Sequence, residues 1–330
     1  MKFTASAPGK AILFGEHYVV YGSPALSVAI EPRSLVEFSE AEHGILLKSS
    51  LGNGKIPETG EFSGSEELRC FSEVAKKIGG KIISCTASFK PGWKLKGAGT
   101  SASLCAAFAA GLFHLLGKQP SAEELFEAAQ AGDMVAHKGK ASGIDAKTVC
   151  LGAPLVFTRS FDPPGFIGKK TGFCLPKQTV LLLIDTFEGK KDSTGKMVEK
   201  FAQEFDIVGK PQSAAKEKRE QITKEYAPVW EKLNKAIKSA DAKALGSVMN
   251  ENHALLKNRG MSSEGIEKAV SAALSLGAYG AKLTGGGGEG GAVLVLCRKN
   301  DKEKVCTGIG SQTSFACHEI LLANKGACVQ

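Results

Sequence analysis

The sequence lacks a long apolar segment, a paired arrangement of cysteines and a strong excess of either charge. No apolar run in the 330 residues approaches the roughly 18 residues that a membrane-spanning helix needs, and residues 1–10 lack the apolar core of a secretion signal. The nine cysteines are scattered without a Cys-x-x-Cys pair, which favours reduced thiols over disulfides or zinc ligands. We therefore expect a cytoplasmic protein without membrane attachment. A peroxisome-like organelle stays an alternative, although no Ser-Lys-Leu signal ends the chain.

The net charge of +8 is spread along the chain. The lysine-rich stretch 210–224 is better explained as the solvated face of a helix than as a stripe that binds nucleic acid. A mild positive charge suits a small anionic substrate. We expect small-molecule ligands, no nucleic-acid partner, and a monomer or homodimer.

The most informative stretch is Gly-Ala-Gly-Thr-Ser-Ala-Ser at residues 97–103, which continues directly into the apolar segment 104–116. Two glycines permit a tight turn, and the small residues after them can begin a helix whose free N–H groups bind phosphate. The hydroxyl groups of Thr100, Ser101 and Ser103 can reach a phosphate oxygen or a metal ion. An ordinary capped helix explains the same residues about equally well. No Gly-Lys-Ser/Thr follows the glycines, so the phosphate-binding lysine must come from elsewhere.

Three ionisable residues, Lys10, Glu16 and His17, lie close together among apolar residues near the start of the chain. Such a group is costly unless its members pair or bind a ligand. Alone, His17 is as readily a satisfied core histidine and Lys10 a surface lysine. Together they favour a site, held by short strands at 4–7, 11–14, 26–30 and 35–38.

Two aspartates lie at or beyond the end of a helix, which the capping box of Ser121 and Glu124 predicts. Asp133 lies near the end of this helix, and Asp145 follows a turn of small residues, so both can converge on one pocket. Phosphoryl transfer uses one acid to hold magnesium and another to accept the proton of the attacking hydroxyl. From spacing alone, a helix-terminal acid and a turn aspartate remain the simpler interpretation.

A second glycine-rich stretch, residues 282–291, contains six glycines. It formally matches the glycine patterns of dinucleotide-binding proteins and of protein kinases. A dinucleotide site needs a helix after the glycines, whereas residues 292–298 have the pattern of a strand, so an oxidoreductase is the least favoured class. A glycine-rich turn packed closely against a ligand fits better.

In order along nearly the whole chain, these segments resemble the motifs of the GHMP small-molecule kinases. The matching segments are Pro-Gly-Lys at 8–10, Gly-Glu-His at 15–17 with the residues up to 26, the loop at 97–102, and Lys-Leu-Thr-Gly-Gly-Gly-Gly at 282–288. The first segment is most similar to the mevalonate kinases. Galactokinases place Thr-Asp-Tyr-Asn after the histidine, and phosphomevalonate kinases typically have Gly-Glu-Tyr. The loop departs from the family pattern at Ala98 and Thr100, but Thr100 keeps a hydroxyl.

The resemblance implies an α+β, two-domain GHMP kinase fold with its active site in the interdomain cleft. The N-terminal domain would be ribosomal-protein-S5-like and span residues 1–178, and the C-terminal domain would be a ferredoxin-like α/β sandwich spanning 179–330. The implied reaction is ATP-dependent phosphorylation of the primary hydroxyl of mevalonate, giving 5-phosphomevalonate and ADP for isoprenoid synthesis. Phosphomevalonate kinase or another GHMP kinase is the nearest alternative, which His17 disfavours. A catalytically silent ligand-binding relative is disfavoured by the intact Lys10, Ser101 and Asp145.

The resemblance also implies roles for particular residues. Lys10 and Asp145 would be catalytic, because Ser-Gly-Ile-Asp at 142–145 matches the segment that carries the proposed base of the family. Ser101 and Asp133 would hold Mg²⁺, although Asp133 aligns only if one residue is inserted near 137–138. ATP would be bound by Lys96, Gly97, Ala98, Gly99, Thr100, Ser101, Ala102 and Ser103. The substrate would be bound by Glu16, His17, Thr194, Gly285 and Gly286. A plain helix cap explains Thr194 equally well.

Overall fold

The computed structural model describes residues 2–59, 61–80, 83–93, 95, 97–187, 192–209 and 211–330. The first half of the chain folds into strands and four helices, in the order β1 (Lys2–Phe14), η1 (Tyr18–Tyr21), β2 (Ala25–Glu40), β3 (Ile45–Ser49), β4 (Gly52–Ile56), β5 (Ser63–Gly64), η2 (Glu66–Leu68), α1 (Arg69–Ile78), β6 (Cys85–Lys90), α2 (Thr100–Leu115), α3 (Ala122–Ala136), α4 (Ile144–Leu151), β7 (Leu155–Phe161) and β8 (Pro164–Lys170). The second half follows as β9 (Thr179–Asp185), α5 (Thr194–Gln203), η3 (Pro211–Ser213), α6 (Lys216–Ser239), α7 (Ala242–Asn258), α8 (Glu264–Ser275), β10 (Gly280–Thr284), β11 (Ala292–Arg298), η4 (Lys299–Asp301), α9 (Lys302–Thr313), β12 (Ala316–Leu322) and β13 (Cys328–Val329).

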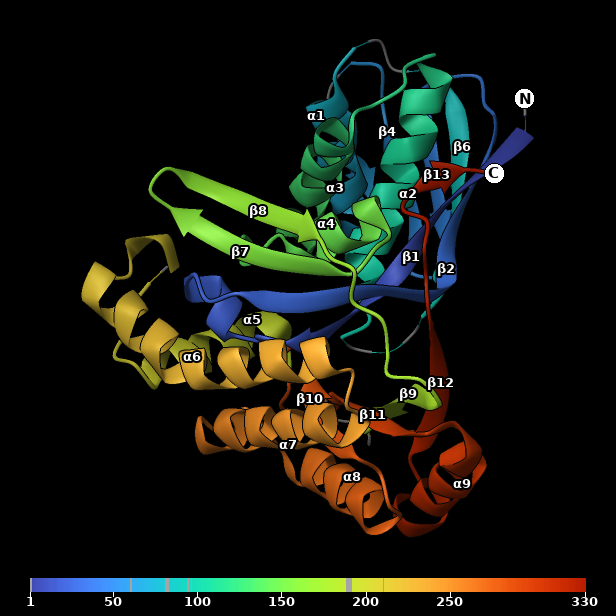
Figure 1. Ribbon diagram of the computed structural model, residues 1–330. Coiled ribbons are helices and arrows are strands. Elements are labelled where there is room, and N and C mark those ends of the chain that lie inside the picture. Colours follow the sequence, from blue (N-terminus) through green and yellow to red (C-terminus); the bar gives the residue numbers. More distant parts are fainter. Residues whose placement is uncertain are drawn as a thin grey trace.

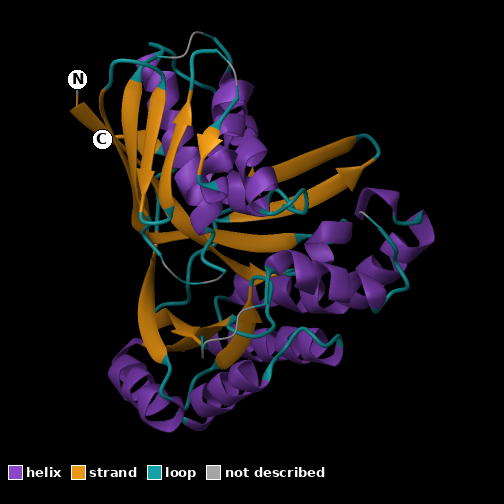
Figure 2. Ribbon diagram, turned by 180° about the vertical axis from the view of Figure 1, so that it is seen from behind, coloured by secondary structure: helices purple, strands orange, loops and turns teal. Residues whose placement is uncertain are grey.

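The strands form one connected sheet across both halves, with the order β10-β11-β9-β12-β2-β6-β3-β4-β5. Strand β12 makes the connection, because it pairs with β9 through Ala316–Ile320 and with β2 through Leu321 and Leu322. Helices α1–α4 gather beside the upper part of the sheet and α6–α9 beside the lower part (Figure 1). The view from behind shows the strands running from one part into the other (Figure 2). The predicted α+β class is confirmed.

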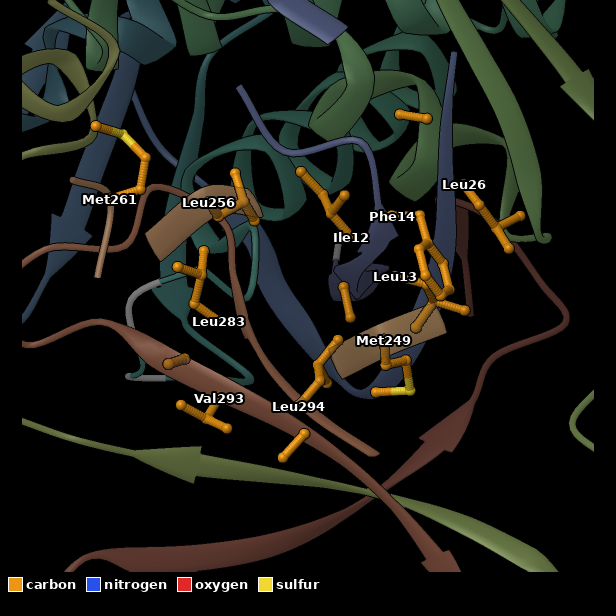
Figure 3. Close-up of a cluster of buried hydrophobic side chains, with 14 of the residues drawn as sticks. Ile12, Leu13, Phe14, Leu26, Met249, Leu256, Met261, Leu283, Val293 and Leu294 are labelled. Atoms are coloured by element: carbon orange, nitrogen blue, oxygen red, sulfur yellow. The ribbon is translucent and has the colours of Figure 1, made fainter. Parts of the chain in front are cut away.

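The hydrophobic core also crosses between the halves. Side chains of β1 and β2, including Ile12, Phe14 and Leu26, belong to the same buried cluster as side chains of α7, β10 and β11. Figure 3 shows this cluster, with Met249 and Leu294 from the second half. A separate cluster fills the space between the first-half sheet and α1–α4. The continuous apolar pattern of β11 reflects burial on both faces.

Helix α2 packs very closely against the sheet. It is buried on nearly all sides, as expected for a helix that is apolar all round. A Cβ atom at Gly111 would lie 2.1 Å from a ring carbon of Phe38, so only glycine allows this approach. The beginning of α2 is thereby held at a set depth beside β1.

Several predicted elements differ in their bounds or type. The four short strands predicted near the start of the chain are the two long strands β1 and β2. The apolar run 148–157 has the pattern of a strand, but its first residues belong to helix α4. A short buried apolar run has the same pattern in either element, and only its packing decides. The capping box at Ser121 and the strand at 292–298 are confirmed. Within the described ranges, no helix is both long and apolar enough to cross a membrane.

Candidate active site

A cavity of about 810 Å³ is lined by segments from both halves of the chain. One wall comes from β1, η1 and the start of α2, and another from the α3–α4 connection. The third wall comes from the beginning of α5 and the glycine run after β10. The cavity therefore brings together residues from all five sequence segments in which site residues were predicted, at 10–17, 96–103, 133–145, 194 and 285–286.

The phosphate loop has the backbone geometry of an anion site. Gly97 and Gly99 have φ angles of 88° and 70°, which favour glycine, and α2 begins at Thr100. The first backbone N–H group of α2 that bonds within the helix is that of Ser103, which donates to Gly99 O at 2.9 Å. The preceding N–H groups are left free for a ligand at the positive end of the helix dipole.

Two of the three loop hydroxyls have hydrogen-bond partners within the protein. Ser103 is fully buried and donates to Ala7 O at 2.9 Å, and Thr100 donates to Trp93 O at 2.9 Å. Of the three hydroxyl residues, Thr100 and Ser101 line the cavity, and only Ser101 has a hydroxyl not used to fix the loop in the described structure. Lys96 lies outside the described residues.

Lys10 joins the loop to the second predicted catalytic residue. Its Nζ lies 3.1 Å from Asp145 Oδ2 and donates to Gly97 O at 2.9 Å. The Lys10 side chain is 3% exposed and that of Asp145 22% exposed, so the pair is buried on one side and open to the cavity on the other. A cation fixed between a phosphate loop and a carboxylate can stabilise charge that moves between them.

Asp133 is buried at the side of the same cavity. It is 1% exposed, and its Oδ1 lies 3.4 Å from His137 Nε2 without a hydrogen bond among the described residues. Burial disfavours the charged form of His137, but the nearby negative charge of Asp133 outweighs it and raises the histidine pKa. A buried carboxylate in the same cavity lining as the Ser101 hydroxyl fits a hard cation such as Mg²⁺.

His17 and the glycine run contact each other in the lining of the cavity. His17 Nε2 lies 3.2 Å from Gly286 O, and its ring stacks on Phe201 with centroids 5.1 Å apart. Gly286 lies against Thr194, since a Cβ at Gly286 would be 3.3 Å from Thr194 Cα. Ser193 caps α5, so the plain cap belongs to Ser193 and Thr194 faces the cavity as the first residue of the helix.

Glu16 is among the residues that line the cavity, but its carboxylate is enclosed by the protein. Its side chain and that of Lys282 are both 0% exposed, and Lys282 Nζ donates to Glu16 Oε1. Burial raises the pKa of Glu16 and lowers that of Lys282, while each opposes the shift in the other. The side chain predicted to bind the substrate is thus one half of a fully buried ion pair in the lining of the cavity.

Other cavity residues carried no recognisable signal in the sequence. Lys140, which lies between α3 and α4, lines the cavity and forms an ion pair with Glu199 of α5. Asp192 lines it as well and accepts a hydrogen bond from Glu289 N at 3.0 Å. Glu289 itself is exposed and is not part of the cavity lining. An apolar region completes the lining, made by Leu51, Phe89, Trp93, Leu95 and Leu104.

Comparison with known proteins agrees with this geometry. The GHMP kinases N terminal domain model matches residues 69–153, and the GHMP kinases C terminal model matches residues 233–312. The mevalonate kinase of Aeropyrum pernix is 33% identical over 98% of this chain and 97% of that protein. The mevalonate kinase of Pyrococcus horikoshii is 30% identical over 92% and 91%. The crystal structure of L. major mevalonate kinase in complex with R-mevalonate has a TM-score of 0.74 at 21% identity, covering 98% of this chain and 97% of that one.

The chain belongs to the GHMP kinase family. The relatives named above are all mevalonate kinases, which agrees with the similarity of residues 8–26 to that branch of the family. The predicted family and its two-domain fold are confirmed.

Proposed function

We propose that this enzyme transfers the γ-phosphoryl group of ATP to the primary hydroxyl of mevalonate and releases 5-phosphomevalonate and ADP. The observation that carries the proposal is the single cavity that is lined by Lys10, Asp145 and the start of α2 together with His17 and Gly286. Identity of 33% to the Aeropyrum pernix enzyme over nearly the full length of both chains supports the choice of substrate.

The transfer forms a bond between the substrate hydroxyl oxygen and the γ-phosphorus while the bond to the β–γ bridging oxygen breaks. Lys10 stabilises the charge that develops on the phosphoryl oxygens, because Gly97 O and Asp145 fix its Nζ beside the loop. Asp145 orients the hydroxyl and takes its proton. The transition state of such transfers is largely dissociative, so orientation contributes more than early proton removal.

Asp133 and Ser101 would hold Mg²⁺ together with phosphate oxygens of ATP. The described residues contain no cluster of three or more His, Cys, Asp or Glu that could hold a metal by itself, so the nucleotide must supply further ligands. When bound, the ion neutralises charge on the β- and γ-phosphates.

Two groups of lining residues suit the two substrates. The side chains of Leu51, Trp93 and Leu95 offer apolar contact for the base of the nucleotide. His17 Nε2 donates to Gly286 O, so its Nδ1 can accept a hydrogen bond from the tertiary hydroxyl of mevalonate. Val19 and Val20 line the same cavity.

A coupled assay of ADP release with mevalonate, phosphomevalonate, galactose and homoserine tests the proposal. We expect mevalonate to give the highest kcat/KM. Preference for phosphomevalonate would favour the alternative kinase, and ATP binding without turnover of any of the four would favour a silent relative. The cytoplasmic location, the domain boundary near residue 178 and a monomeric or homodimeric state stay predictions.

A further inference from the structure

The buried pair of Glu16 and Lys282 needs an explanation other than substrate contact. Both side chains are 0% exposed, and the Lys282 ammonium also donates to Leu283 O. Removing two charges from water offsets most of their mutual attraction, so such a pair adds little net stability compared with apolar residues of the same shape. The geometry that the pair imposes on its neighbours is the better explanation.

Each member of the pair lies close in the chain to one of the two residues, His17 and Gly286, that are proposed to bind mevalonate. Glu16 precedes His17 in the chain, and Lys282 lies on β10, which leads into Gly286. Two further side-chain contacts connect the same two segments. Thr284 Oγ1 donates to Ile12 O at 2.9 Å, and His17 Nε2 lies 3.2 Å from Gly286 O. In the described structure, the ion pair is thus accompanied by two hydrogen bonds between residues 12–17 and residues 282–286.

His17 is held in a conformation that needs such support. Its φ and ψ angles are 61° and −49°, a region that residues with a Cβ atom rarely adopt. Backbone conformations of this kind persist only where surrounding contacts determine them, and they are concentrated at functional sites. The residue before His17 is fixed by the pair, and the four-residue turn η1 follows it directly.

We infer that Glu16 and Lys282 are positioning residues for substrate binding. Their ion pair holds the strained backbone of His17 so that the imidazole stays against Gly286 and presents its edge to mevalonate. This inference rests on the proposed function, because it assigns to the pair the affinity for that substrate. It predicts that the pair affects mevalonate binding more than ATP binding or stability.

The double variant Glu16→Gln/Lys282→Met tests the inference, because it removes both charges and leaves side chains of similar size. Each single variant would leave one buried charge unpaired, and we expect those to be strongly destabilised. For the double variant we expect a mevalonate KM raised roughly tenfold, the effect of losing one hydrogen bond. The KM for ATP should change less, because the hydrogen bonds of the pair within the described structure go to each other and to Leu283 O, and not to the phosphate loop.

The matched control is Lys302→Met/Glu319→Gln, which neutralises an ion pair between α9 and β12 that does not line the cavity. An unchanged mevalonate KM in a folded double variant would overturn the inference. If the double variant does not fold, Glu16→Asp keeps the charge and shortens its reach by one methylene, and an unchanged mevalonate KM there overturns it equally. Failure of the proposed function is seen separately, as absent mevalonate turnover in the unmodified enzyme.

Discussion

Lys10 has two fixed partners, the carboxylate of Asp145 and the carbonyl of Gly97, and both lie at the boundary between the phosphate loop and the cavity. Glu16 has a different kind of partner, the fully buried Lys282. Two lysine–carboxylate pairs that look alike in the sequence therefore have different uses. The pair open to the cavity can act on a ligand, and the enclosed pair can act only through its neighbours.

Asp145→Asn and Lys10→Met should each remove most turnover and leave ATP binding nearly unchanged. Both groups act where charge moves during transfer, and losing one such contact costs about 2.7 to 4 kcal/mol, or roughly 10² to 10³ in kcat. Steady-state kinetics and nucleotide titration check this. Turnover of Asp145→Asn at the level of the unmodified enzyme would remove Asp145 from the catalytic role.

His17→Leu should raise the KM for mevalonate by several-fold to about a hundredfold, because a hydrogen bond contributes about 0.5 to 3 kcal/mol depending on the charge of its partner. The KM for ATP should change much less. A buried histidine with a purely structural role would instead lower the melting temperature and shift both constants together. Measuring both constants beside a melting curve separates the two roles.

The buried imidazole of His253 makes the stability of the protein depend on pH in a way that can be tested. Leu283 N donates to its Nδ1 at 3.3 Å, so the neutral ring carries its proton on Nε2, which lies 3.0 Å from Glu267 Oε1. Burial lowers the pKa of His253 below 6.5, although Glu267 opposes the shift. As the pH falls, His253 therefore gains a proton in the unfolded chain before it does so in the folded chain. The stability that is present above pH 6.5 is lost as the pH falls towards and through the pKa of the folded state. His253→Gln should show a shallower loss of melting temperature below pH 6.5 than the unmodified protein, and equal slopes would contradict this account.

At the scale of elements, the phosphate site depends on how α2 meets β1. Helix α2 is apolar on all sides and packs closely through Gly111, so its first turn is placed by burial of the whole helix. Its N-cap, Gly99, has no side chain to satisfy the free N–H groups. A helix start that is rigidly placed and left uncapped is suited to receive a phosphate.

Gly99→Val should abolish nucleotide binding. The φ angle of 70° disfavours a side chain, and a Cβ there would lie 2.8 Å from Lys10 Cγ. The control is Gly117→Val, at a glycine that follows the C-terminal end of α2. Gly117 has a similar φ angle of 64°, but a Cβ atom there would have no other atom within 4 Å. We expect the control to lose stability by about 1 to 2 kcal/mol and to keep its nucleotide affinity. Unchanged ATP affinity in folded Gly99→Val would show that the loop only caps the helix.

At the scale of the whole molecule, the two halves share one sheet and one core. Strand β12 pairs with β9 and with β2, and the cluster in Figure 3 contains residues of both halves. The end of the chain returns to the first half, where β13 pairs with β1 and Arg33 donates to Gly326 O at 2.6 Å. Neither half can therefore lose its structure without exposing apolar surface of the other.

Thermal unfolding should accordingly show one cooperative transition, because the shared core couples the halves more strongly than a separable domain interface would. Differential scanning calorimetry checks this, with the calorimetric and van't Hoff enthalpies compared. Two resolved transitions would mean that the halves unfold independently, and the continuous sheet would then have little energetic weight.

Much of this protein was determined by local sequence. The glycines at 97 and 99, the capping box at Ser121 and the apolar strand at 292–298 have the structures that their own chemistry favours, so the sequence predicted them. The candidate site residues were predicted because their motifs are short and contiguous. The family followed from these motifs and was confirmed by comparison with known proteins.

Only the tertiary structure decided which of these groups meet. The partner of Glu16 lies 266 positions away at Lys282, and no local pattern distinguishes a carboxylate that faces a ligand from one that faces a buried lysine. Likewise, the hydroxyl of Ser103 bonds to Ala7 because α2 packs against β1, which a motif match does not encode. Local chemistry sets what each segment can form, whereas burial and long-range pairing set which polar groups are used to hold the fold and which remain for a substrate.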